Sequence, residues 1–277
     1  MALLTVLLVC LGIYNNNIDV EQPTKNEISI ALNDAVKWLE VNEHVIVKDH
    51  NPALWWILKE AYLVMNNKHL EKIYLNYKHT FLDSAPRNVW SPYFYDNYKP
   101  VIEDIFELYP MHEYQLLFVY SLSCSANIKD ESIIQKQLKS DFCSNHFLHT
   151  RCVTHQLMAV RRLNKSQCGS YELLSDELLG IIRQEIIYDY RVTDSYIQRA
   201  LMLAESNRPL KPIWISKILA AQKDDGGWAD FYPLMKLGSL QIGSASISIK
   251  KGPKKSDFHI TAQAIWLLSL LLNQMEE

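Results

Sequence analysis

The sequence predicts an all-α protein. Apolar residues recur at steps of three and four along almost the whole chain, which is the pattern of amphipathic helices. The chain has 277 residues, 48% of them hydrophobic, so it is long enough to bury a large core. Predicted helices that are apolar around most of their circumference alternate along the chain with helices that have one apolar side. Helical pairs that repeat in this way are typical of solenoids and closed rings.

The first residues form a separate element. Residues 2–14 carry no charge, and at about 1.5 Å per residue they are too short for the ~30 Å core of a bilayer. Their length suits the apolar part of a signal peptide, although a basic start and an A-x-A site are missing. We predict a signal peptide or N-terminal anchor over 1–14, with a buried first helix as the alternative. The Asn-rich residues 15–27 are predicted to form a linker.

Residues 28–277 are predicted to form one domain. Inner helices, which are apolar around most of their circumference and must be surrounded by other helices, are predicted at 52–66, 112–123, 153–163, 194–204 and 260–272. Outer helices with one apolar side are predicted at 28–43, 68–82, 131–141, 172–188 and 212–222. The inner helices are too apolar for the concave face of an open solenoid, so a closed α/α toroid of about five to six helical hairpins fits better. Near-alternation over 240–250 indicates a short inserted β-hairpin.

The starts of the inner helices carry polar residues. Asn51, Thr193 and Asp257 suit N-cap positions, where a side-chain oxygen accepts a free backbone N–H, and Pro52 suits the first helical position. Titratable residues also stand at these starts, namely His50, His112, His155, Asp194 and His259. If the inner helices run parallel, all of these side chains lie on one rim of the ring.

The strongest local motif is QKDDGGW at residues 222–228. Gly226 and Gly227 suit the end of an outer helix, Gln222 can bond to the backbone ends of neighbouring helices, and Trp228 can fill the space between hairpins. The motif resembles the QW repeat of squalene and terpene cyclases, and similar turns occur in protein prenyltransferase β subunits and some α/α-toroid polysaccharide lyases. Thr261 and Ala262 match the Thr-Ala step of these families. The resemblance covers about residues 213–272 and implies the toroid fold.

The resemblance does not extend to the families' chemistry. The D-x-D-D acid motif of squalene cyclases and the D-x-C half of the prenyltransferase zinc site are absent. His259 stands one residue earlier than the prenyltransferase zinc histidine, and Lys217 replaces the aromatic residue or Leu that is usual in the cyclase repeat. Whether the chain is an enzyme stays open, with lyase, hydrolase and cyclase as the candidate classes.

The rim residues suit either acid–base chemistry or zinc. A helix N-terminus disfavours imidazolium, so these histidines would tend to be neutral, as bases and metal ligands must be. The candidate catalytic residues are His155, Asp194, His259 and His112, and the candidate metal ligands are His155, His259, Cys152 and His50. A metal-free polar site and unrelated histidines are the alternatives.

Four cysteines follow the leader: Cys124, Cys143, Cys152 and Cys168. In an exported chain they allow two disulfides, with three connectivities. The step-of-three run Cys143, His146, His149, Cys152 and His155 turns too far around a helix for one tetrahedral site. We favour a Cys143–Cys152 disulfide, with a metal cluster and free buried thiols as alternatives.

Two functions are compatible with these patterns. The net charge of -3 shows no basic excess, so we predict no nucleic-acid partner. The first hypothesis is an exported toroid enzyme, secreted, periplasmic or membrane-anchored through 1–14, that acts on a small-molecule, lipid-like or glycan ligand at a His-lined mouth. In it His155 or His259 acts as base or ligand, and Asp194 orients it. The second is a non-catalytic binding module of the same fold.

Overall fold

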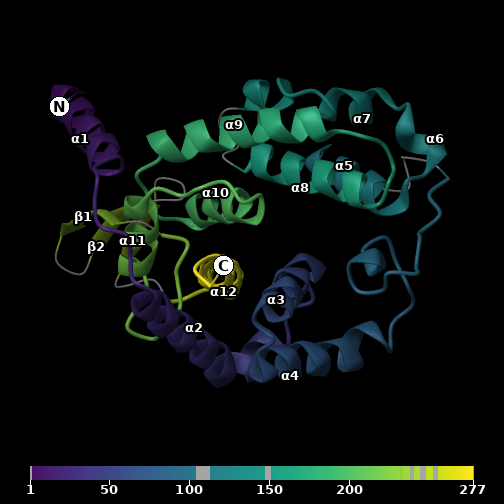
Figure 1. Cartoon of the computed structure of the whole chain (residues 1–277), viewed down its shortest axis with the longest axis horizontal. Coiled ribbons are helices and arrows are strands. Elements are labelled where there is room, and N and C mark those ends of the chain that lie inside the picture. The colour runs from purple at the N-terminus through teal and green to yellow at the C-terminus, as the bar shows by residue number, and fades with distance from the viewer. Residues whose placement is uncertain are drawn as a thin grey trace. The chain divides into compact units, whose positions relative to one another are not determined.

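The computed structural model describes residues 2–103, 113–146, 151–231, 233–237, 240–243, 248–251 and 255–276. The chain divides into two compact units: Met1–Ser84 together with Glu185–Glu277 form unit 1, and Ala85–Gln184 form unit 2. Both are built mainly of helices, which confirms the predicted all-α class (Figure 1). The domain predicted over 28–277 is thus divided, because the chain leaves unit 1, forms unit 2 and returns.

Helix α12 (Phe258–Gln274) is the central helix of unit 1, and most of its residues are buried. Its helices are α1 (Ala2–Asn15), α2 (Lys25–Ile46), α3 (Pro52–Met65), α4 (Lys68–Tyr77) with a π-helical turn (Lys78–Leu82), α10 (Asp194–Glu205), α11 (Pro212–Ala220) and α12 (Phe258–Gln274). Helix α12 packs against α2, α3 and α10. Every residue of α10 from Asp194 to Ala204 is buried. The predicted inner helices 52–66, 194–204 and 260–272 are therefore neighbours, as their apolar circumference requires.

Unit 2 contains the remaining helices. They are α5 (Glu113–Ser123), α6 (Ala126–Lys129), α7 (Ser132–Gln137), α8 (Cys152–Lys165), most of α9 (Glu172–Tyr188), and 3-10 turns at Ser91–Tyr93 and Phe142–His146. The predicted inner helices α5 and α8 pack against each other, and α7 packs on α5. Helix α9 crosses the boundary, since its last residues belong to unit 1.

Both disulfides lie in unit 2. Cys143 pairs with Cys152, with Cα atoms 5.6 Å apart, which confirms the favoured prediction. Cys124 pairs with Cys168, with Cα atoms 5.4 Å apart. Cys10 in α1 is free and exposed. Disulfides persist in oxidising compartments, so the two pairs agree with the coarse expectation of an extracytoplasmic environment.

The predicted helix starts are confirmed in two of three cases. Asn51 accepts the Ala53 N–H at 3.0 Å, and Asp257 accepts the His259 N–H at 3.0 Å. Thr193 occupies the N-cap of α10 but makes no capping side-chain hydrogen bond. A cap that the sequence analysis missed is Thr24, which forms a capping box with Glu27 at the start of α2.

The turn at residues 222–228 joins three helices of unit 1. Gln222 Nε2 donates to the Ala31 carbonyl in α2 at 2.8 Å, and the buried Trp228 donates from Nε1 to the Ile218 carbonyl in α11 at 2.8 Å. The Trp228 N–H donates to Thr261 Oγ1 in α12 at 3.0 Å. Gly226 has φ +92°, and a side chain there would clash with the backbone oxygen of Asp34. These contacts give the motif the structural role predicted for it.

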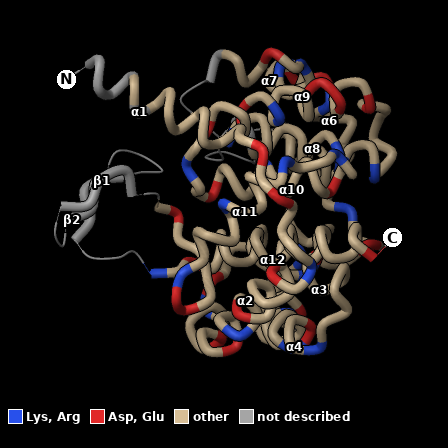
Figure 2. The backbone as a smooth tube through the Cα atoms, turned by 60° about the vertical axis from the view of Figure 1, so that its left-hand side comes forward, with Lys and Arg blue, Asp and Glu red and all other residues tan. Residues whose placement is uncertain are grey.

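The N-terminal segment bears on one of the two alternatives for residues 1–14. Helix α1 carries no charged residue (Figure 2), and its described apolar side chains are largely exposed, with Leu7 54% and Tyr14 68% accessible. The alternative of a buried first helix is therefore wrong for these residues. Asn16 and Pro23, in the predicted linker, are buried. In the described parts of the chain, no helix is both long and apolar enough to cross a membrane.

A small antiparallel sheet lies between α11 and α12 in the sequence. Its strands are β1 (Pro233–Leu237), β2 (Leu240–Gly243) and β3 (Ser248–Lys251), in the order β1-β2-β3. Strand β2 pairs with β1 with Met235 opposite Ile242, and with β3 with Ile242 opposite Ile249. Strands β2 and β3 thus fall where the sequence predicts a hairpin at 240–250.

Candidate functional site

Two predicted site residues meet at the starts of two packed helices in unit 1. Asp194 is the first residue of α10 and His259 the second residue of α12, and these helices pack together. The His259 Nδ1 atom lies 3.5 Å from Asp194 Oδ1. The Asp194 side chain is 2% exposed and the His259 side chain 31% exposed. The predicted pairing of Asp194 with an inner-helix histidine is therefore present, with the carboxylate inside and the imidazole reaching the surface.

The other ring nitrogen of His259 faces Gln263, one turn further along α12. Gln263 is fully buried, and its Nε2 donates to His259 Nε2 at 2.9 Å. An amide nitrogen can only donate, so Nε2 accepts in this contact and Nδ1, toward Asp194, is the ring nitrogen that carries a hydrogen. Gln263 Oε1 is buried and has no hydrogen-bond partner among the described residues. A half-turn of the amide would place Oε1 on a protonated Nε2, so Gln263 can accompany both protonation states of His259.

A second carboxylate lies at the start of α10. The Asp194 backbone N–H donates to Asp230 Oδ1 at 3.1 Å. Asp230 follows the Trp228 turn, so the structural motif also positions a residue of the site. A helix N-terminus favours negative charge, so the start of α10 is a suitable place for both carboxylates. The arrangement suits proton transfer, because a buried carboxylate can stabilise positive charge that forms on the imidazole beside it.

The other predicted site residues have different neighbours. His155 belongs to unit 2, where its Nδ1–H donates to the Arg151 carbonyl at 2.6 Å and its ring meets the Phe118 ring edge-on. His50 is exposed, and its ring centroid lies 4.5 Å from that of Phe81. His112 and His149 lie outside the described residues. The structure thus brings Asp194 and His259 into contact and gives His50 and His155 other partners.

The prediction of Cys152 as a metal ligand is wrong for the disulfide form. A cysteine binds a metal as its thiolate, and the Cys152 sulfur is bonded to Cys143. Among the residues that the structure describes, no group of three or more His, Cys, Asp or Glu side chains is placed to hold a metal ion. The zinc site with His155, His259 and His50 stays a prediction.

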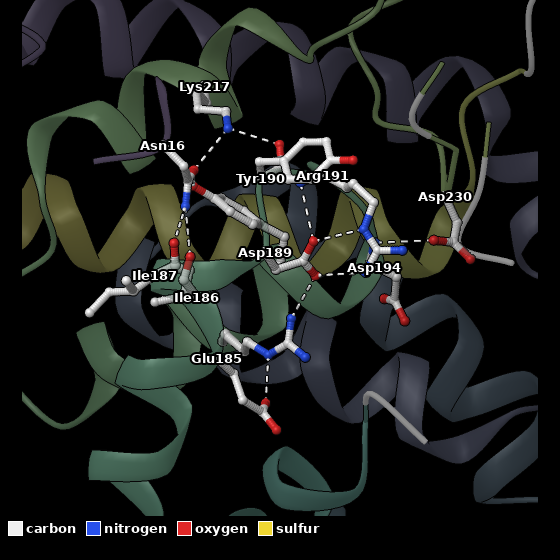
Figure 3. A network of polar contacts seen from close by, with 12 residues as sticks. Asn16, Glu185, Ile186, Ile187, Asp189, Tyr190, Arg191, Asp194, Lys217 and Asp230 are labelled. Atoms are coloured by element: carbon white, nitrogen blue, oxygen red, sulfur yellow. Dashed lines mark hydrogen bonds and ion pairs between the residues drawn. The ribbon is translucent and has the colours of Figure 1, made fainter. Parts of the chain in front are cut away.

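Sequence reasoning missed a charged cluster at the C-terminal end of α9 (Figure 3). Asp189 accepts hydrogen bonds from Arg199 Nη1 at 2.9 Å and from Arg191 Nε at 2.8 Å. The buried Arg199 also donates from Nε to Glu185 at 2.8 Å. Burial lowers the pKa of Arg191, but its hydrogen bond with Asp189 and the charge of that carboxylate outweigh burial and raise the pKa above its ordinary value. The cluster joins α9 to α10 and has no local sequence signature.

Lys217 of α11 lies close to this cluster. Its Nζ donates to Asn16 Oδ1 and to the Tyr190 carbonyl, both at 2.8 Å (Figure 3). Burial lowers the pKa of Lys217 to about 8, although the charge of Asp189 opposes the shift. A neutral amine keeps two N–H donors and can still make both hydrogen bonds. The sequence signal for this residue was its departure from the cyclase repeat.

The comparisons with known proteins assign no relative to this chain. No protein-family model, curated protein or solved structure matches it.

Proposed function

We propose that the chain is an enzyme with an acid–base site at His259 and Asp194, acting on a lipid-like or glycan ligand. The observation that carries the proposal is the 3.5 Å approach of His259 Nδ1 to the buried Asp194 carboxylate. A buried carboxylate that orients a surface-reaching imidazole is a common arrangement for a general base. Hydrolysis, elimination and cyclisation all need such proton transfer.

The proposed mechanism follows from the different partners of the two ring nitrogens of His259. With the Gln263 amide displaced by substrate, the Nε2 lone pair of His259 accepts a proton from a water, hydroxyl or C–H group. The positive charge that forms on the ring is stabilised by Asp194, which is too buried to be screened by water. Asp230 binds the backbone N–H of Asp194 and so acts as a positioning residue.

The toroid and the exported location belong to the same proposal. The resemblance of residues 222–228 to the QW repeat supports a toroid, as does the packing of α12 between α3 and α10. The two disulfides support an oxidising location outside the cytoplasm. Secretion, a periplasmic location and anchoring to a membrane through residues 1–14 are the three forms of this proposal. A zinc-assisted variant would need ligands beyond the Asp194–His259 pair, and metal analysis of the purified protein tests it directly.

The activity test uses the full chain and three variants. Wild type, His259→Gln, Asp194→Asn and the control His44→Gln are assayed against neutral and acidic polysaccharides, glycan esters and isoprenoid compounds. We expect a loss of turnover of roughly 10²- to 10⁴-fold in His259→Gln. His44→Gln, which changes an exposed histidine of α2, should keep its activity. Full activity in His259→Gln would remove the proposal.

One observation favours the non-catalytic alternative. Gln263 already occupies His259 Nε2, so both ring nitrogens face groups of the protein itself. If no compound is turned over but one binds equally well to wild type and His259→Gln, the chain is a binding module.

A further inference from the structure

Asn16, in the segment predicted to be a linker, is buried and makes four side-chain hydrogen bonds in unit 1. It is 0% exposed. Its amide nitrogen donates to the Ile186 carbonyl at 2.7 Å and to the Ile187 carbonyl at 3.3 Å (Figure 3). Its side-chain oxygen accepts from Tyr196 Oη and from Lys217 Nζ, both at 2.8 Å. Both amide hydrogens and both lone pairs of a primary carboxamide are therefore used.

The groups around Asn16 need a ligand of this chemistry. Ile186 and Ile187 lie in the last turn of α9, whose carbonyls have no partners within the helix. The Tyr196 side chain is fully buried, so its hydroxyl would lose a hydrogen bond without an acceptor. A carboxylate offers acceptors alone to the two carbonyls, and an apolar side chain offers nothing to any of the four groups. The donors and acceptors are thus arranged for a carboxamide.

Two neighbouring residues hold the same segment. Asn17 donates from Nδ2 to the Ile187 carbonyl at 2.9 Å and accepts from Lys211 Nζ at 2.9 Å. Trp214, fully buried in α11, donates from Nε1 to the Asn16 backbone carbonyl at 3.0 Å. Gly12 approaches Tyr190 so closely that a Cβ would lie 2.7 Å from its ring. The segment 12–17 therefore contacts α9, α10, α11 and the residues between α9 and α10.

We propose that the Ile186 and Ile187 carbonyls, Tyr196 and Lys217 form a carboxamide-binding site, and that Asn16 of the same chain is its ligand. Residues 12–17 are then a strap that completes unit 1. The uncharged helix α1 is attached to this strap and stays with the folded unit as long as Asn16 is bound. Processing that cuts before Asn16 leaves the site filled, whereas removal of the chain up to and including Asn17 empties it. This inference does not depend on the proposed enzymatic function.

The test measures whether the strap stays bound after its peptide link is cut. A specific protease site is inserted in the full chain between Glu21 and Gln22, which are exposed. The nicked protein is separated by size-exclusion chromatography, and mass spectrometry measures how much N-terminal fragment remains bound. We expect the wild-type fragment to stay bound and the Asn16→Leu fragment to be released, with the bound fraction reduced at least about tenfold.

Matched variants keep the result interpretable. Asn15→Ala changes the exposed neighbour of the same type and should retain the fragment. Lys217→Met alters the site from its other side, leaves the strap sequence intact and should speed release. If Asn16→Leu does not fold, Lys217→Met and hydrogen exchange over residues 12–17 in the uncut chain decide the question. Retention in every variant, or release from wild type as fast as from Asn16→Leu, overturns the proposal.

Discussion

The two units are stabilised by different kinds of interaction. Unit 2 contains both disulfides, whereas the only cysteine of unit 1 in the sequence is Cys10, which is free. Unit 1 has side-chain hydrogen bonds between residues far apart in the chain, at the buried Asn16 and at Gln222, and a buried ion pair between Asp189 and Arg199. A disulfide acts mainly by restricting the unfolded chain, whereas a buried polar network stabilises only if all of its groups keep their partners.

This difference predicts which changes should destabilise each unit. Unit 2 should be sensitive to reduction and tolerant of many surface substitutions, because its cross-links do not depend on exact hydrogen-bond geometry. Unit 1 should resist reduction and be sensitive to single substitutions that leave a buried group without its partner, which costs about 1–3 kcal/mol for a neutral group. Four measurements test the comparison.

The largest effect is expected from removing the long-range disulfide of unit 2. Cys124 and Cys168 are separated by 44 residues, and the chain-entropy relation gives about 4 kcal/mol for a loop of that length. The double variant Cys124→Ser/Cys168→Ser should therefore lose several kcal/mol in denaturant unfolding. Hydrogen exchange should rise in α5 and α8 more than in α10 and α12. Equal increases in both units would show that their stabilities are not separable in this way.

A smaller effect is expected at the turn of unit 1. Gly226→Ala should destabilise the protein by about 2–4 kcal/mol, because φ is +92° and the new Cβ meets the Asp34 carbonyl oxygen. Gly180→Ala in α9, where a Cβ has open space, is the matched control and should stabilise by about 0.5–1 kcal/mol. Thermal unfolding of the two variants measures the contrast. A change in stability of the same sign in both variants would contradict the prediction.

The N-cap of α12 should contribute about 1 kcal/mol. Asp257→Ala removes the acceptor of the His259 N–H and should lower the free energy of unfolding by that amount. Asp257→Asn keeps a side-chain oxygen and should cost only a few tenths of a kcal/mol, from the lost charge at the helix N-terminus. Urea titrations of both variants provide the measurement. An equal loss in the two would assign the effect to charge and not to the hydrogen bond.

The last expected effect is a pH dependence of stability from Lys217. Its pKa is lowered from 10.5 to about 8 in the folded protein, so between these values the unfolded chain binds more protons than the folded one. The contribution of Lys217 to stability therefore rises with pH from about 8 to 10.5. The difference in unfolding free energy between wild type and Lys217→Met should move in favour of wild type over this range. A difference that stays constant with pH would show that Lys217 keeps an ordinary pKa when folded.

Local patterns predicted the helices well and their interruptions poorly. The predicted inner helix at 194–204 matches α10, because its apolar residues mark both its length and its burial. The outer helix predicted at 131–141 is only α7, Ser132–Gln137, and the one predicted at 68–82 ends in a π-helical turn. Propensity and spacing do not show where a helix meets a disulfide loop or changes its hydrogen-bond pattern.

The candidate site was predicted in part. Asp194 and His259 were chosen because each begins an inner helix, and α10 and α12 do bring them together. The same criterion also selected His155 and His50, which have other neighbours, because a position at a helix start does not say which starts meet. Gln263 and Asp230 were missed, since their roles depend on His259 and on the backbone of Asp194.

The sequence by itself determined the helical class, two of the N-caps and the Cys143–Cys152 link, because these depend on residues close together in the chain. Only the tertiary structure decided that Asn16 is a buried ligand and not part of a linker. Its partners Ile186, Tyr196 and Lys217 lie 170 to 201 residues away. A polar residue is stable in the interior only when such distant groups satisfy all of its hydrogen bonds, and no local pattern records that they do.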